Sequence, residues 1–143
     1  MMHEIECRGK QLTSGDWVYG FPFIEKSKNF IVKPGYTYDQ ETQFIEIMPE
    51  TLCQFTGCFA KKSYLGRREH DLRIFNRDIV RYGNLNRMTE PDVNLGVVIK
   101  ESGCFFINEE VLINIMDYPD IEIIGNIIDF PSLEKEISND KYL

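Results

Sequence analysis

The sequence lacks the long apolar run that a signal peptide or a membrane-spanning helix requires. No stretch of about 18 uncharged apolar residues occurs, and residues 1–8 hold no apolar segment of the kind found in signal peptides. We therefore expect a cytoplasmic protein that does not enter a membrane. Histidine is also scarce, with two residues in 143, which leaves few candidates for a general base or an imidazole metal ligand.

The short motifs that mark common active sites are absent as well. The chain has no glycine-rich phosphate loop, no serine elbow and no dinucleotide fingerprint. A thiol nucleophile needs a neighbouring base, and Cys58 with His70 is the pair to consider, but no cysteine-enzyme pattern surrounds either residue. We expect a packed thiol and a surface imidazole. The sequence therefore predicts a protein that is not an enzyme, with no catalytic residue, no cofactor and no small-molecule substrate.

Cysteine is present but sparse, and its pattern does not predict a metal site or a disulfide framework. Cys53 and Cys58 fall within the spacing range of zinc pairs, yet a structural site needs four ligands and no second close pair follows. In a chain without a secretory signal, thiols stay reduced and act as small hydrophobic residues. We expect no bound metal and four reduced thiols, at Cys7, Cys53, Cys58 and Cys104.

The residues that are present define a globular chain. Of the 143 residues, 43% are hydrophobic and 27% are charged, and ten Phe, seven Tyr and one Trp supply large apolar side chains. A domain of this length buries about two-thirds of the surface that its unfolded chain exposes, so it needs no disulfide or metal to be stable. The net charge of −7 argues against coating nucleic acid or an anionic membrane, because that binding depends on Lys and Arg.

The charge is distributed unevenly along the chain. Residues 60–88 hold eight basic and three acidic side chains, a net charge of +5, and the rest of the chain carries −12. This basic segment could form a basic face on an acidic chain. Its cations pair with the acidic remainder of the chain or with an acidic partner surface, which we favour, or they bind the phosphates of a nucleic acid. The candidate binding residues are Lys61, Lys62, Arg67, Arg68, Arg73 and Arg77.

Short strand-like runs separated by turn residues dominate the pattern. Residues 53–71 have no clean period and suggest a loop, and residues 111–116 fit either a strand or a helical turn. Asn76 is the expected positive-φ residue of a tight turn, and Gly125 is expected to form a bulge or to allow a close approach by another backbone. A short helix is predicted over residues 130–137. The predicted strands are 17–24, 30–32, 44–47, 72–75, 79–82, 95–100, 104–107 and 121–128.

One predicted strand carries an aromatic stripe. Trp17, Tyr19, Phe21 and Phe23 alternate along it and therefore share one face. On a small barrel such a stripe usually belongs to the core, which is the interpretation that we favour. The alternative is an exposed platform for single-stranded nucleic acid or a groove for a peptide.

Six short runs, in this order along the chain, resemble the YopX family of phage and prophage proteins. The runs are Arg8-Gly9-Lys10, 15–20 (GDWVYG), 47–51 (IMPET), 54–57 (QFTG), Asp78-Ile79-Val80 and 123–127 (IIGNI). The chain departs from the family pattern at Asn76-Arg77-Asp78, where the family usually has Glu-Gly-Asp. It also has a longer stretch at residues 61–71.

The resemblance implies a single YopX-like domain over residues 1–143. It implies a mainly β fold with a small SH3-like barrel in the second half, additional N-terminal strands and one short C-terminal helix. It also implies a phage or prophage protein in the cytoplasm of a bacterial host. The family offers no activity to carry over. Our leading hypothesis is an accessory protein that binds a protein partner or assembles with itself, and the alternative is a small-barrel nucleic-acid binder that uses residues 61–87.

Overall fold

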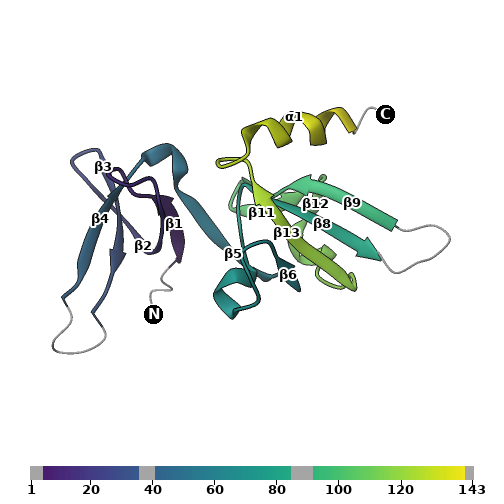
Figure 1. Cartoon of the computed structure of the whole chain (residues 1–143), viewed down its shortest axis with the longest axis horizontal. Helices are drawn as coiled ribbons and strands as arrows, with labels where there is room; N and C mark the ends of the chain where they lie inside the picture. Colours follow the sequence, from purple (N-terminus) through teal and green to yellow (C-terminus); the bar gives the residue numbers. More distant parts are fainter. Residues whose placement is uncertain (1–4, 36–40, 85–91, 141–143) are drawn as a thin grey trace. The chain divides into compact units, whose positions relative to one another are not determined.

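The structure is a computed structural model that describes residues 5–35, 41–84 and 92–140. It divides the chain into two compact units, Met1–Phe55 and Thr56–Leu143 (Figure 1). The predicted mainly β fold with one short C-terminal helix is confirmed. The single cooperative domain over residues 1–143 stays a prediction. Within the described residues, no helix is long and apolar enough to cross a membrane.

The first unit is an antiparallel sheet. Its strands follow the order β4-β3-β2-β1-β5, and a short 3-10 helix at Pro49–Thr51 precedes β5. Strands were predicted at β2, β3 and β4, and these predictions are confirmed. The bounds are β1 (Cys7–Lys10), β2 (Trp17–Glu25), β3 (Lys28–Lys33), β4 (Gln43–Ile47) and β5 (Cys53–Phe59).

Pro22 is tolerated in β2 because of where β2 changes partners. Residues 17–20 of β2 pair with β1, whereas the strand from Phe21 onward pairs with β3. Since proline has no N–H to donate, it fits where one side of the strand carries no ladder. Gly20 lies at this change of partner, and a Cβ there would clash with the carbonyl oxygen of Val32. The two strands can therefore approach closely only because residue 20 has no side chain.

The core of the first unit lies on the face opposite the aromatic stripe. Cys7, Val18, Ile31 and Ile47 are buried together. None of the four stripe residues is buried, and Phe23 is 41% exposed. The interpretation of the stripe as core is therefore wrong. The β-branched residues of β3 and β4 fill the core instead, because they pack closely on a pleated surface.

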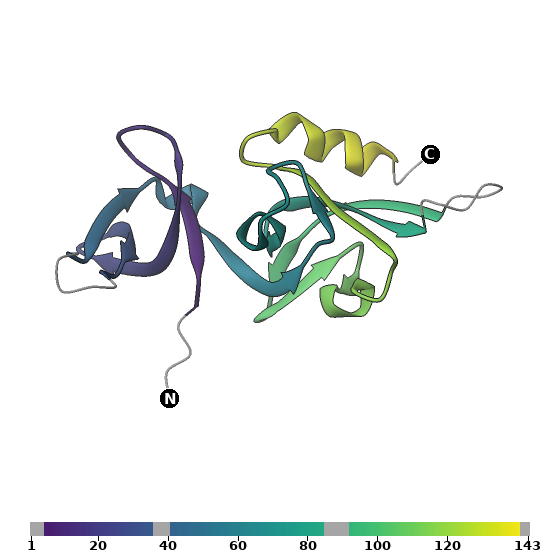
Figure 2. The ribbon, with the colours of Figure 1, turned by 60° about the horizontal axis from the view of Figure 1, so that its bottom comes forward.

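The second unit contains two further sheets. One has the order β6-β13-β8-β9 and the other the order β10-β11-β12, while β7 lies beside β5. Figure 2 shows the helix α1 (Pro131–Asp140) along one side of this unit. The elements are β6 (Lys62–Ser63), η2 (Glu69–Leu72), β7 (Arg73–Phe75), β8 (Asp78–Asn84), β9 (Asp92–Val97), β10 (Ile99–Glu101), β11 (Cys104–Ile107), β12 (Glu110–Val111), η3 (Leu112–Ile115) and β13 (Asp120–Asn126).

The last strand runs through the core of this unit. Ile121 and Ile123 of β13 are almost fully buried, together with Val80 and Tyr82 of β8. The pairing of β13 with β8 shifts register between Ile123 and Gly125, so the predicted bulge is confirmed. The ring of Phe130 lies 3.3 Å from the place where a Cβ of residue 125 would stand.

The described strands of the second unit form no closed barrel, so the expected SH3-like barrel is not confirmed. The apolar run at residues 95–101 divides at Val98, whose N–H donates to Asp78 and whose carbonyl accepts from Arg77. The chain before Val98 pairs with β8, and the chain after it forms the first strand of the separate β10-β11-β12 sheet. One run that looked like one strand therefore belongs to two sheets.

Two local predictions are also wrong. Residues 53–59 form β5 and not a loop, because tertiary contacts hold them, including the bond from Thr56 Oγ1 to the carbonyl of Ile74 at 2.7 Å. In the turn before β8, the residue with positive φ is Arg77 (φ 74°) and not Asn76. Residues 111–116 combine both of the open alternatives, with β12 followed by η3. A polar connection was expected at residues 83–92; its ends belong to β8 and β9, and residues 85–91 lie outside the described residues.

Candidate functional site

The six predicted binding residues come from different elements of the second unit, and several have structural roles. Lys61 donates from Nζ to the carbonyls of Tyr118 and Pro119, both at 3.0 Å. Arg77 lies in the turn before β8 and lines a groove that is described below. Lys62, Arg67 and Arg68 are exposed. The exposed part of the predicted basic face is therefore smaller than the sequence suggests.

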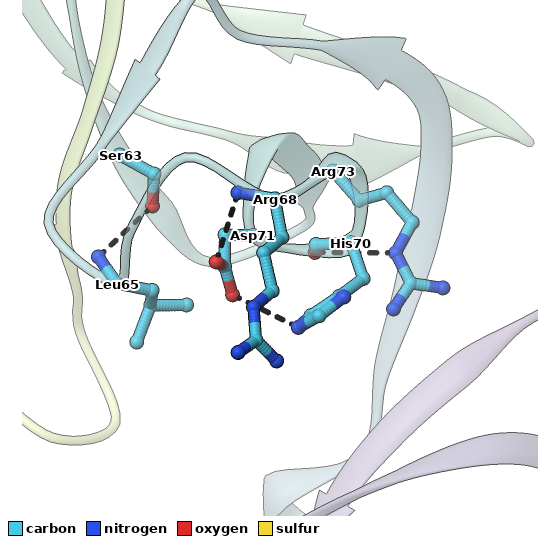
Figure 3. Close-up of polar contacts among 6 residues, drawn as sticks. All are labelled: Ser63, Leu65, Arg68, His70, Asp71 and Arg73. Carbon is cyan, nitrogen blue, oxygen red and sulfur yellow. Dashed lines mark hydrogen bonds and ion pairs between the residues drawn. The ribbon is translucent and has the colours of Figure 1, made fainter.

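Around η2, Asp71 bonds to the local backbone and to His70 (Figure 3). The carboxylate accepts the backbone N–H of Arg68 at 3.2 Å and pairs with Nε2 of His70 at 3.2 Å. Arg73 donates from Nε to the carbonyl of His70 at 3.3 Å and stacks over the ring of Phe75 at 5.8 Å. Partial burial lowers the pKa of Arg73, although an arginine stays protonated at neutral pH. Arg73 therefore supports the fold around this loop.

Cys58 was the thiol considered as a nucleophile, with His70 as its base, and its environment does not favour that role. Burial raises the pKa of Cys58, and the hydrogen bond with Thr56 opposes this more weakly. A raised pKa is the reverse of what a thiolate nucleophile needs. Cys53 and Cys58 lie five positions apart on β5. Within residues 5–35, 41–84 and 92–140, no three metal-binding side chains gather.

An aromatic patch covers the outer face of the first unit. We define it by Phe23, Phe30 and Phe44, which come from β2, β3 and β4. The ring centroids of Phe23 and Phe30 lie 6.4 Å apart, and those of Phe23 and Phe44 lie 5.7 Å apart in an edge-to-face contact. Phe23 is 41% and Phe44 58% exposed. Three rings from three strands thus form a continuous apolar surface.

Charges of both signs border the aromatic patch. Glu25 pairs across strands with Lys28, and Glu46 pairs with Phe30. Directly opposed residues of an antiparallel sheet point to the same side, so these charges lie on the outer face with the rings. At the other end of β2, the buried Arg8 stacks 4.5 Å over the ring of Trp17. The outer face is therefore apolar at its centre and charged at the margin that Glu25, Lys28 and Glu46 form.

The second unit contains a groove of about 760 Å³. Its walls come from β10, from the turns that flank β8 and β12, and from the helix α1. The lining combines apolar side chains with two cations and three carboxylates. The residues are Asn76, Arg77, Val97, Val98, Ile99, Lys100, Glu101, Phe106, Asn108, Glu109, Ile127, Glu134 and Ile137.

Sequence reasoning missed both surfaces for identifiable reasons. The stripe was assigned to the core because it is aromatic, although Ile31, Ile45 and Ile47 gave a competing apolar face. The alternation along β4, which places Phe44 opposite Ile45 and Ile47, carried the correct signal. The residues that line the groove range from 76 to 137 in the sequence, and no local sequence pattern predicts that they lie together. Neither a family model, nor a curated protein, nor a solved structure matches this chain.

Proposed function

We propose that this protein is a non-enzymatic binding module that pairs with a second copy of itself through the aromatic patch. The observation that carries the proposal is the exposure of Phe23 and Phe44 in one edge-to-face cluster. Phenylalanine rings in water cost free energy, and contiguous exposed rings mark interaction surfaces. Aromatic residues are also enriched at the centres of protein interfaces.

The charges around the patch support a second copy as the partner. A two-fold axis brings the same surface together from both chains, so the surface must complement itself. Lys28 lies on the same face as Glu25 and Glu46. Rotation about an axis through the patch can therefore place Lys28 of one copy against a glutamate of the other. A surface of one sign would repel its own copy.

The nucleic-acid alternative has weaker support. Its exposed cations are Lys61, Lys62, Arg67 and Arg68, while Arg87 lies outside the described residues. The chain as a whole carries −7, which opposes the approach of a polyanion. A nucleic-acid binder would retain an unspecific oligonucleotide at low salt and release it steeply as salt rises. We expect no such retention.

The origin of the protein belongs to the same proposal. We propose membership of the YopX family on the basis of the six ordered runs. Membership implies that the protein comes from a phage or prophage and acts in the cytoplasm of a bacterial host. It also implies that the second unit is related to SH3-type domains. An accessory protein that assembles with itself is consistent with a chain that has no recognisable catalytic motif. Self-association can be measured whether or not the protein comes from a phage.

The decisive measurement is the oligomeric state by sedimentation equilibrium. The native protein should form a dimer whose population rises with concentration. Phe44→Glu should give a monomer, because it places two like charges at the centre of the interface. Ile113→Glu is the matched control, since Ile113 is 66% exposed but lies in η3 of the other unit. Circular dichroism should show that both variants are folded. A native protein that stays monomeric up to its solubility limit, or a Phe44→Glu variant that still dimerises, would contradict the proposal.

A further inference from the structure

The groove of the second unit has the form of a site for an extended chain. One wall is β10, all three residues of which line the groove, and another is the helix α1, which contributes Glu134 and Ile137. The strand β10 is the last in the order of its sheet. Extended peptides bind at such positions in known recognition modes, where they run beside an edge strand. The volume of about 760 Å³ is within the range of ligand sites.

Strand geometry determines which side chains face the groove. Ile99 pairs with Phe106 across the β10–β11 ladder, so both lie on one face, and Glu101 shares that face with Ile99. Lys100 pairs with Phe105, which packs against the core of the unit, so Lys100 leaves the strand on the opposite side. The groove face of β10 therefore combines apolar surface with a carboxylate.

The rim of the groove is rich in acidic groups. Glu101, Glu109 and Glu134 come from β10, from the turn after β11 and from α1. Within the part of the chain that the structure describes, none of these three carboxylates takes part in an ion pair. Two cations, Arg77 and Lys100, also line the groove, but Lys100 leaves β10 on the face of Phe105 and not on the face of Ile99 and Glu101, so carboxylates outnumber cations in the lining.

Apolar residues supply the floor of the groove. Val98 is fully buried, Ile99 is 48% exposed, and Ile127 and Ile137 are partly buried. An apolar floor with polar groups at the rim is the usual composition of a binding site. Successive side chains of a strand point to opposite sides. A partner that alternates apolar and basic side chains along an extended backbone would therefore fit both the apolar floor and the acidic rim of the groove.

We propose that this groove binds an extended basic peptide segment of another protein, with its apolar side chains on Ile99, Phe106 and Ile127 and its basic side chains beside Glu101 and Glu134. This site is separate from the aromatic patch and goes beyond self-association. It gives the protein a second partner of defined chemistry. The free carboxylates of the rim supply the preference for positive charge.

The probe is a short fluorescein-labelled peptide of alternating lysine and valine, added to the full-length protein and followed by fluorescence anisotropy. We expect saturable binding that weakens as salt is raised, because the rim charges are exposed to solvent. Glu134→Lys should weaken binding by about tenfold or more. Glu136→Lys is the matched control: it makes the same change on an exposed residue of α1 that does not line the groove. It should leave the affinity nearly unchanged.

Two further arms separate this proposal from its alternatives. A peptide of alternating glutamate and valine should not bind, and the Phe44→Glu variant should bind the lysine–valine peptide as the native protein does. Absence of saturable binding would overturn the proposal. Equal loss in Glu134→Lys and Glu136→Lys would also overturn it, since binding would then depend on net charge and not on the groove. Loss of binding in Phe44→Glu would place the peptide on the aromatic patch and reject the groove.

Discussion

The carboxylate of Asp78 accepts the backbone N–H of Phe75 at 2.8 Å, and both residues are buried. The bond closes the turn that joins β7 to β8. Arg77 lies inside this turn, where its N–H donates to the carbonyl of Val98 and its carbonyl accepts from Ile127. One short turn thus connects β8 to the start of β10 and to the chain after β13.

Removal of the Asp78 carboxylate should destabilise the second unit. Asp78→Ala leaves the buried N–H of Phe75 without this acceptor, which costs about 1–3 kcal/mol of the free energy of unfolding. Asp78→Asn keeps an oxygen that can accept the bond and should cost less. Urea denaturation of both variants measures the difference. Equal losses for alanine and asparagine would show that the charge of Asp78, and not the bond to Phe75, stabilises the turn.

Arg77→Gly should be neutral or mildly stabilising. Arg77 has φ of +74°, a conformation that costs a non-glycine residue roughly 1–2 kcal/mol. Glycine removes this strain but gains freedom in the unfolded chain, which offsets about 0.4–1 kcal/mol. Arg77→Ala keeps the strain and serves as the control. If Arg77→Gly lost more than about 1 kcal/mol in urea denaturation, contacts of the arginine side chain would have to outweigh the strain.

The two units should unfold as one domain, and the single tryptophan can report this. Ile123 is 1% exposed in the second unit, so Ile123→Ala should cost about 2–5 kcal/mol. Trp17 lies in the first unit, and its fluorescence should show the same shift of the unfolding midpoint. Ile113→Ala, at a 66% exposed position, should change little. A Trp17 transition that keeps the parent midpoint while circular dichroism loses stability would show that the units unfold separately.

The four thiols should differ in their rates of alkylation. They differ in exposure: Cys104 is exposed, Cys7 and Cys53 are buried, and Cys58 is partly buried. Because burial raises the pKa of Cys58, less of it is thiolate near neutral pH, and its rate should keep rising at a pH above the ordinary range of a thiol. Mass spectrometry after brief iodoacetamide treatment should find the first adduct on Cys104. Cys104→Ser should abolish this fast phase, and a first adduct on Cys58 would contradict the expectation.

The sequence predicted local elements well and tertiary relationships poorly. The strands predicted at residues 95–100 and 104–107 follow from local chemistry, and the short turn at Ser102-Gly103 between them joins β10 to β11 in an antiparallel hairpin. The bulge at Gly125 likewise follows from a glycine inside an apolar strand. The division of one apolar run between two sheets at Val98 depends on bonds to Asp78 and Arg77, about twenty positions away. No short-range pattern contains that information.

The candidate sites show the same limit. Side-chain alternation correctly separated Phe44 from Ile45 and Ile47, but alternation does not say which face becomes the core. That choice depends on which side of the sheet the rest of the unit covers. The basic segment was visible as composition, yet Lys61 and Arg73 bond to carbonyl groups that the sequence could not place beside them.

Turn residues with positive φ affect how fast the chain can fold. The β2–β3 turn consists of Lys26 (φ 50°) and Ser27 (φ 66°), and the β11–β12 turn of Asn108 (φ 50°) and Glu109 (φ 69°). Tight hairpin turns favour glycine or asparagine at such positions, so most of these residues oppose early hairpin closure. Contacts between distant strands must then form before the strained turns are stable. Slow folding limited by loop closure is expected of such a chain, and Ser27→Gly should accelerate it if the first hairpin forms in the transition state.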